Sequence, residues 1–322
     1  MADALPSGTS ASNTSLHAAK RAKNDEFYTQ LADIENELKH YKEHFRGKVV
    51  FCNCDDPDWS SFWVYFQEGF EHLGLAKLIA THYEQGSQTY KLEFDGRRSA
   101  DGKPIVRQTD LEGDGDFRST ECVELLKQAD IVVTNPPFSL FREYVSQLIE
   151  HKKKFVILGN NNAITYKEVF KLIRDNELWL GYGVNKTMEF RLAPDYARWS
   201  RVDAKGNKYG KVPAISWFTN LPHKKRNEEL ILFRSYAGNE HKYPQYDNYD
   251  AIEVSKVVDI PADYTGAMGV PITFLDKYNP EQFEIVGIDR QLIEELTGKV
   301  SRFFKGGAEL YARIVIKRRV RA

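Results

Sequence analysis

Strand-like and helix-like segments alternate between residues 48 and 175, and this alternation limits the fold more than any other feature of the chain. Short apolar runs rich in β-branched side chains predict strands at residues 48–52, 77–81, 129–134 and 154–159. Apolar residues at helical spacing predict helices at residues 62–73, 119–126, 140–150 and 165–174. Because strands joined by helices form a parallel sheet, the predicted fold class is α/β with a mostly parallel central sheet.

The segments outside this alternation have other patterns. A helix is predicted at residues 25–45, where apolar side chains recur between charged ones. Strand-like runs flank a turn rich in Arg, Asp and Gly, so residues 84–108 are expected to form an inserted hairpin. Glycines, lysines and aromatic residues dominate residues 183–211, which are expected to form a variable loop. Later apolar runs predict further strands at residues 215–219, 271–275 and 311–316.

Bulk properties narrow the class of protein. A chain of 322 residues is long for one domain, and residues 1–15 have the composition of a disordered leader. No apolar stretch approaches the ~18 residues that span a bilayer, so no membrane association is expected. Three cysteines and no visible secretory signal predict the reducing cytoplasm. The Cys52-Asn53-Cys54 pair lacks a second ligand pair, so no metal site is predicted.

The strand at residues 129–134 ends abruptly in Asn135-Pro136-Pro137-Phe138. The two prolines fix φ and cannot continue a ladder, so Asn135 is expected on a rigid loop at the carboxyl end of a buried strand. Ligands bind at that edge of open α/β sheets. An amide, two backbone carbonyls and an aromatic ring can clamp a planar group that carries an amino substituent. A simple strand-ending turn would explain a bare proline pair, but the flanking Asn and Phe favour a functional site.

Basic residues are clustered although the net charge is only −1. Clusters occur at residues 20–23, 151–154, 223–226 and 317–321, and they would form a DNA-binding surface only if they converged on one face. DNA contacts are predicted for Lys186, Arg201, Lys205, Lys208, Lys224, Lys225 and Arg226. A solvated loop around residues 199–211 would have the same composition, so the pattern alone leaves both interpretations open.

The tetrad at residues 135–138 resembles the catalytic motif of amino-group methyltransferases that use S-adenosylmethionine. Segments similar to the EcoRI-type adenine-specific DNA methyltransferases also occur, in the same order, at residues 24–30, 50–57, 113–119, 130–144, 269–275 and 278–284. The resemblance covers nearly the whole chain past the leader and is weakest at residues 183–236. It implies a Rossmann-like methyltransferase fold at residues 16–222 and a mixed α/β target-recognition region at residues 223–322.

The same resemblance implies roles for individual residues. Phe27, Tyr28 and Thr29 would contact the methionine end of the cofactor. Cys52, Asn53 and Asp55 lie in the loop that would hold the cofactor after the first strand. Asp116 would accept a hydrogen bond from the amino group of the cofactor adenine, and Phe117 would pack on the adenine ring. Asn135, Pro136, Pro137 and Phe138 would form the site for the target base.

Two departures from the usual methyltransferase pattern occur around the cofactor loop. The loop at residues 52–57 has no glycine, although backbone must approach the ligand closely there. Thr81, His82 and Tyr83 stand where an acidic residue usually holds the cofactor ribose. Asp55 or Asp56 would then supply the ribose contact.

The implied reaction is transfer of a methyl group from S-adenosylmethionine to the N6 amino group of adenine in duplex DNA. The target base must be flipped out of the duplex to reach the tetrad. Double-stranded DNA is the expected partner, a monomer the expected state, and a restriction-modification system the expected setting. The motif also fits a methyltransferase acting on RNA adenine or on a protein glutamine amide. A DNA-binding regulator without turnover is the alternative from another class.

Overall fold

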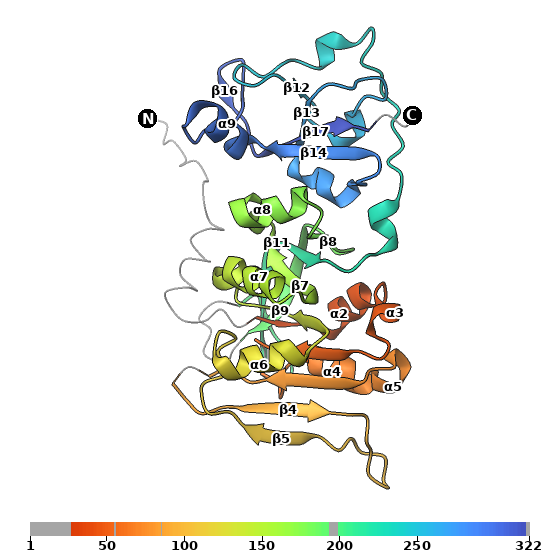
Figure 1. Ribbon diagram of the computed structural model, residues 1–322, viewed down its shortest axis with the longest axis vertical. Helices are drawn as coiled ribbons and strands as arrows, with labels where there is room; N and C mark the ends of the chain where they lie inside the picture. The colour runs from red at the N-terminus through yellow and green to blue at the C-terminus, as the bar shows by residue number, and fades with distance from the viewer. Residues whose placement is uncertain (1–26, 55, 85, 193–198, 320–322) are drawn as a thin grey trace.

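The computed structural model describes residues 27–54, 56–84, 86–192 and 199–319. Within these ranges, eleven strands form one large sheet, and a four-stranded sheet forms a second unit at the C-terminal end (Figure 1). The path through the large sheet runs, in order, through β1 (Phe27–Thr29), β9 (Lys186–Leu192), β11 (Lys208–Thr219), β7 (Lys154–Asn160), β6 (Ile131–Thr134), β2 (Val49–Cys52), β3 (Lys77–Thr81), β4 (Tyr90–Phe94) and β5 (Arg107–Asp110). Short strands β8 (Trp179–Leu180) and β10 (Arg201–Val202) also pair with β11.

The large sheet is mixed, and the prediction of a mostly parallel sheet was wrong in this respect. Parallel pairing joins β3, β2, β6 and β7, which are the strands that helices connect. Antiparallel strands extend the sheet on both sides, through β4 and β5 at one edge and through β11, β9 and β1 at the other. Short connections join β3 to β4, and such connections permit only antiparallel pairing, whereas β11 meets β7 and β1 meets β9 from distant parts of the chain.

Helices cover both faces of the large sheet, so the parallel strands are buried on both sides. One face packs against α6 (Thr120–Gln128), α7 (Phe141–Glu150) and α8 (Lys167–Arg174). The other face packs against α2 (Leu31–Leu38), α3 (Lys42–Phe45), α4 (Ser61–Glu68) and α5 (Phe70–Leu73). Alternation along β2 illustrates this arrangement, since Phe51 belongs to the first core and Val50 to the second. As predicted, Ser119 caps α6 by accepting a hydrogen bond from the Cys122 amide at 3.2 Å.

The C-terminal unit contains β12 (Ile252–Glu253), β13 (Met268–Pro271), β17 (Arg313–Arg318) and β14 (Phe283–Ile288), with α9 (Asp289–Thr297) and the hairpin of β15 (Phe304–Lys305) and β16 (Ala308–Glu309). Its core is continuous with the first core of the large sheet, because Phe283 and Ile316 belong to the same apolar cluster as Phe155 and Phe170. Helix α8 lies against β14 (Figure 1). The two sheets therefore share one hydrophobic interior.

Three further predictions about elements need correction. The helix predicted at residues 25–45 is strand β1 followed by α2 and α3, because residues 27–29 pair with β9; residues 25 and 26 lie outside the described ranges. The strand predicted at residues 271–275 ends at Pro271, where η6 (Ile272–Lys277) begins, since proline cannot continue a ladder. The loop predicted at residues 183–211 contains β9, β10 and the start of β11.

Single-turn 3₁₀ helices connect several of these elements. They are η1 (Phe138–Leu140), η2 (Asn161–Thr165), η3 (Lys224–Asn227), η4 (Glu240–Lys242) and η5 (Val257–Asp259). Among the helices of the described ranges, none is long and apolar enough to cross a membrane.

Candidate functional site

The tetrad lies at the carboxyl end of β6, between β2 and β7 in the centre of the large sheet. Asn135 is 6% exposed and Phe138 is 9% exposed, and the amide of Leu140 donates to the Pro137 carbonyl at 2.9 Å to begin η1. In Figure 1 the β4 arrow points to the right, so the parallel strands, which run opposite to β4, end at the left. The tetrad therefore occupies the edge where open α/β sheets bind ligands, as the sequence predicted.

Hydrogen bonds hold the loop after β2 next to the tetrad. The Thr134 hydroxyl donates to the Asn53 carbonyl, and the Tyr144 hydroxyl donates to the Asn53 side-chain oxygen. Burial raises the pKa of Tyr144 well above its usual value, so this hydroxyl stays a donor. The glycine-free loop turns at Cys54, whose φ is +70°. A left-handed conformation costs a non-glycine residue ~1–2 kcal/mol, so the bonds from Thr134 and Tyr144 offset strain in this loop.

The glycine-rich loop at residues 113–119 approaches the same place from the side of β3. Gly115 has a φ of +76°, and a Cβ atom there would lie 1.9 Å from the His82 carbonyl oxygen. Only glycine permits this approach. The Phe117 ring lies edge-on to the Tyr144 ring, with centroids 5.0 Å apart. Tyr144 therefore joins the two loops that the sequence predicted to hold a cofactor.

Asp116 is ionised and already has a cationic neighbour. Arg118 Nη2 donates to Asp116 Oδ2 at 2.6 Å, and Arg118 Nε donates to Oδ1 at 2.8 Å. These hydrogen bonds lower the pKa of Asp116 below its usual value. A carboxylate has about four acceptor positions, so Asp116 can still accept from a second group.

A third group of polar side chains lies where the loop after β2 meets the end of β3. Asp56 Oδ2 is 3.7 Å from His82 Nε2, and the Tyr90 hydroxyl donates to Asp56 Oδ1 at 3.4 Å. Burial, followed by the charge of Asp56, raises the pKa of Tyr90. Asp55, the neighbouring residue in the sequence prediction, lies outside the described residues.

Strand β1 pairs with the outer side of β9. It lies past the carboxyl end of β7, on the side of the sheet edge that carries the tetrad. Thr29 is opposite Phe190, and its side-chain oxygen is buried without a hydrogen-bond partner among the described residues. Such an orphan hydroxyl costs free energy unless a ligand satisfies it. Tyr28 is partly buried on the other face of the strand, and the side chain of Phe27 is not described.

Strands β9, β10 and β11 form a ribbon that projects past the edge carrying the tetrad. Only Ile215–Thr219 of β11 pair with β7, whereas Tyr209–Val212 pair with β9 and Tyr209 also pairs with β10. Lys186 lies opposite Ile215 at the base of the ribbon, and Lys205 is exposed in the turn at its tip. Two aromatic rings carry cations there, with Arg201 3.8 Å from the Tyr209 centroid and Lys208 4.4 Å from the Trp199 centroid.

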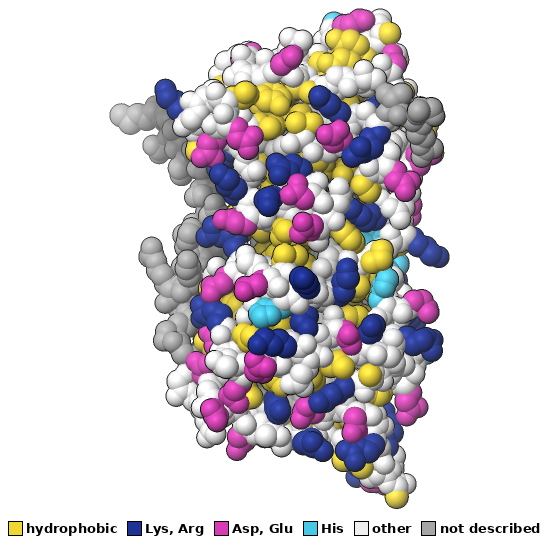
Figure 2. All heavy atoms as spheres, viewed as in Figure 1, with side chains coloured by type: hydrophobic (Ala, Val, Ile, Leu, Met, Phe, Trp, Pro, Cys, Tyr) yellow, Lys and Arg dark blue, Asp and Glu magenta, His cyan; other side chains and the backbone are white. Residues whose placement is uncertain are grey.

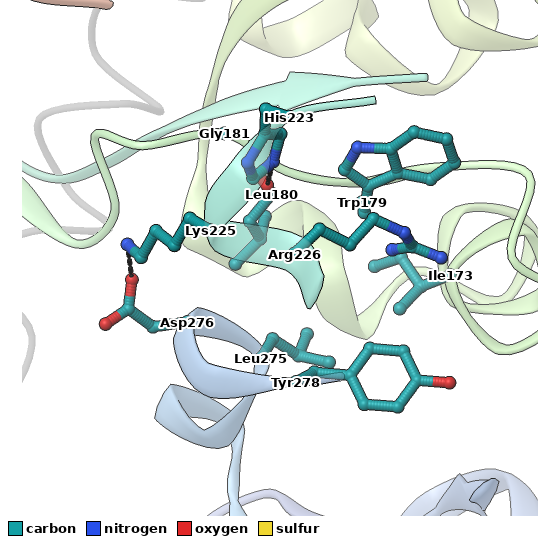
Figure 3. A pocket seen from close by; sticks show the side chains of 10 residues that line it. All are labelled: Ile173, Trp179, Leu180, Gly181, His223, Lys225, Arg226, Leu275, Asp276 and Tyr278. Atoms are coloured by element: carbon teal, nitrogen blue, oxygen red, sulfur yellow. Dashed lines mark hydrogen bonds and ion pairs between the residues drawn. The ribbon is translucent and has the colours of Figure 1, made fainter. Parts of the chain in front are cut away.

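Basic residues at 224–226 have a different setting from the ribbon (Figure 3). Lys225 forms an ion pair with Asp276, and the Arg226 guanidinium lies 3.9 Å from the centroid of Trp179 and 5.9 Å from that of Tyr278. Asp276 and Tyr278 belong to the C-terminal unit, so Lys225 and Arg226 join it to the large sheet. Lys224 is exposed.

The described basic clusters do not gather on one face, and the predicted cluster at residues 20–23 and the end of the one at 317–321 lie outside the described ranges. Lys152, Lys153 and Lys154 lie at the start of β7, which is the edge opposite the tetrad, and Lys153 donates to the carbonyls of Lys127 and Ala129 at 2.8 and 2.7 Å. Figure 2 shows lysine and arginine interspersed with acidic side chains over the visible face. The ribbon is therefore the predicted basic segment that lies next to the tetrad.

Sequence reasoning missed two residues that build the site. Tyr144 contacts Asn53 and Phe117, yet in the sequence it reads only as an apolar position of a helix. The close approach of Gly115 to His82 was also unforeseen. A glycine within a predicted ligand loop was the only available signal, and it did not identify the neighbouring strand.

Known proteins match this chain over most of its length. The model of the family described as adenine-specific methyltransferase EcoRI matches residues 15–319. The Type II methyltransferase M.EcoRI of Escherichia coli is 48% identical over 312 residues, which cover 91% of this chain and 95% of that protein. The Type II methyltransferase M.MpnI of Mycoplasma pneumoniae is 44% identical, covering 94% and 98%. M.MgeORF184P of Mycoplasma genitalium, also a Type II methyltransferase, is 43% identical, covering 94% and 98%.

Proposed function

Because this chain belongs to the family of the EcoRI adenine-specific methyltransferase, we propose that it transfers a methyl group from S-adenosylmethionine to the N6 amino group of adenine in duplex DNA. The observation that carries the proposal is the position of Asn135-Pro136-Pro137-Phe138 at the carboxyl end of the central strand β6. Both loops predicted to hold the cofactor meet there through Tyr144. On this proposal, the parallel strands and their helices form the Rossmann-like core of a catalytic domain at residues 16–222, and residues 223–322 form the target-recognition region.

The polar and aromatic groups of the described residues fit the chemistry of S-adenosylmethionine. The orphan hydroxyl of Thr29 can donate to the carboxylate at the methionine end of the cofactor. Asp116 can accept a hydrogen bond from the adenine amino group of the cofactor. Phe117, which packs against Tyr144, can contact the adenine ring. Asp56 is the proposed partner of the cofactor ribose, because its carboxylate, in the loop after β2, lies beside His82 at the end of β3. Cys52 and Asn53 shape the loop beneath, and the cofactor supplies an electrophilic methyl sulfonium when it is bound.

Asn135 and Pro136 activate the target amine. The lone pair of the adenine amino nitrogen is delocalised into the ring, which makes it a poor nucleophile. The Asn135 side-chain oxygen and the Pro136 carbonyl accept hydrogen bonds from the two N–H groups of this amine. These bonds favour a tetrahedral nitrogen. Preorganised groups aimed at developing charge are the main source of rate enhancement. Alignment of nitrogen and methyl group, fixed by the rigid Pro136-Pro137 backbone, supplies the remainder.

The target adenine must leave the duplex to reach this edge. Extrusion costs a few kcal/mol, and stacking on an aromatic ring recovers roughly 1–3 kcal/mol per base. Phe138 is the proposed stacking residue. Since it is only 9% exposed and packs in the core on the side of α2–α5, it must rotate outward to stack fully.

The ribbon is the proposed DNA contact beside the target site. Lys186, Arg201, Lys205 and Lys208 lie on it, whereas Lys225 and Arg226 are engaged between the two sheets and are left out of the proposed interface. Lys224 remains a proposed contact because it is exposed. We further propose that the protein acts as a monomer in the cytoplasm, as the modification enzyme of a restriction-modification system.

One experiment separates the possible acceptors. The protein is incubated with cofactor carrying a labelled methyl group and with duplex DNA, RNA or total cell protein. We expect label in DNA, at N6 of adenine. Label confined to RNA or to glutamine in protein would assign the alternative acceptors, and cofactor binding without transfer to any acceptor would indicate a regulator.

The proposed role of the ribbon predicts an effect on DNA affinity. Replacing Lys205 with Ala is expected to weaken binding to all duplex sequences alike and to lower the slope of log K against log salt by about one unit, because one phosphate contact is lost. Lys152→Ala, at the opposite edge, is the matched control and should leave the slope unchanged. Equal slopes for Lys205→Ala and the unmodified protein would remove the turn from the interface.

A further inference from the structure

Arg142 and Tyr166 form a cation–π pair beside the tetrad. Arg142 is exposed in the first turn of α7, four residues after Phe138, and its Cζ lies 5.3 Å from the centroid of the Tyr166 ring. Tyr166 follows η2, the turn that begins where β7 ends. The pair therefore spans the carboxyl ends of the neighbouring strands β6 and β7.

Three other described arginines near this edge already donate to protein acceptors, including Arg201 of the ribbon, which keeps fewer donors for DNA. Arg118 pairs with Asp116, Arg201 pairs with Glu189, and Arg191 donates to Asn207 at 2.6 Å. Arg142, in contrast, makes no ion pair with a carboxylate of the described residues, and the nearest acid in sequence, Glu143, lies with Arg118. Its guanidinium donors are thus available to a ligand.

Tyr166 gives the guanidinium a fixed aromatic neighbour. Its ring is partly buried and packs against the same apolar cluster as α7 and α8, so it is a fixed platform. A cation–π contact with a ring uses none of the guanidinium N–H donors. Those donors match two oxygens of a phosphate, which arginine binds in a bidentate manner.

We propose that Arg142 binds a backbone phosphate of the target strand beside the extruded nucleotide, with Tyr166 as its positioning residue. The inference rests on the proposed function, because it needs duplex DNA over the tetrad edge. A flipped base turns about its own sugar-phosphate backbone, and a cation held next to Asn135-Pro136 would fix that backbone once the base has entered. This contact would favour the flipped state over the stacked one.

The test uses a duplex built around an adenine that sequencing of methylated DNA has identified. Binding is measured over a range of salt, and flipping is read from the emission of 2-aminopurine placed at the target position. For Arg142→Ala we expect about tenfold weaker binding, a salt slope lower by about one unit and a reduced emission increase. Arg142→Lys should keep the slope but recover only part of the emission, since lysine retains the charge without the planar fork.

Controls separate this contact from other causes. Tyr166→Phe keeps the ring and should behave like the unmodified protein, whereas Tyr166→Leu should reproduce part of the loss of emission. Arg174→Ala, at the far end of α8, should have no effect. The affinity for S-adenosylhomocysteine, measured by calorimetry without DNA, should be the same in all variants.

Two results would overturn the inference while leaving the proposed function intact. An unchanged salt slope and emission for Arg142→Ala would remove the phosphate contact. A loss of S-adenosylhomocysteine affinity in that variant would assign Arg142 to the cofactor instead. If the unmodified protein bound no duplex DNA at all, the proposed function would fail first and this inference with it.

Discussion

Replacing Asn135 with Ala is expected to lower the rate of methyl transfer by roughly 10²–10³-fold or more, because the reaction loses the side-chain acceptor that activates the amine. Cofactor affinity, duplex affinity and the free energy of unfolding should change little. The measurement is single-turnover transfer of labelled methyl to duplex DNA, together with calorimetric binding of S-adenosylhomocysteine. The effect should lie in the chemical step, since Asn135 would act on the amine only after the base has entered.

Asn135→Asp is the matched variant for this test. It keeps an acceptor oxygen at the same place and should therefore retain far more activity than Asn135→Ala. Unchanged transfer by Asn135→Ala would contradict the proposed mechanism. Loss of transfer accompanied by unfolding would point instead to a structural role, which the 6% exposure of Asn135 makes necessary to check.

Gly115→Ala is expected to lower the free energy of unfolding and to weaken cofactor binding. The added Cβ would lie 1.9 Å from the backbone oxygen of His82, and the φ of +76° is unfavourable for alanine. The φ change alone costs ~1–2 kcal/mol, and relieving the clash must move either the loop or the end of β3. We therefore expect a loss of more than ~2 kcal/mol in denaturant unfolding, with at least a tenfold weaker affinity for S-adenosylhomocysteine.

Gly113→Ala provides the control within the same loop. Nothing lies within 4 Å of a Cβ built on Gly113, and its φ is outside the left-handed region. Its effect on the free energy of unfolding should stay within ~0.5 kcal/mol, as for other open surface positions. If both variants behaved alike, the approach of Gly115 to β3 would have no energetic importance.

Much of the fold was predictable because its signals are local. The strands at residues 48–52, 77–81 and 154–159 and the cap at Ser119 were all expected from periodicity and from side-chain chemistry. The hairpin of β4 and β5 was also expected, but the antiparallel addition of β9 and β11 was not, because nothing in residues 183–211 says which strand they will meet. Pro271 shows the same limit. The apolar run that it begins was predicted to be a strand, but the strand lies before Pro271 and ends there.

The candidate site also contains parts that the sequence predicted and parts that it did not. Asn135 and the loops at residues 52–57 and 113–119 were identified from the sequence, and they lie around one edge of the sheet. The basic residues were harder to interpret, because sequence shows composition but not neighbours. Lys205 lies on a ribbon beside the tetrad, whereas Arg226 lies between Trp179 and Tyr278.

Local sequence signals alone were enough to place Asn135 at the proposed site of chemistry. A buried strand stopped by two prolines must place Asn135 on a rigid loop, because proline fixes φ and removes a backbone donor. Tertiary structure alone decided how that loop is supported and what surrounds it. Tyr144, Gly115 and Tyr166 acquire their roles from residues far along the chain, and only packing brings such distant groups within contact.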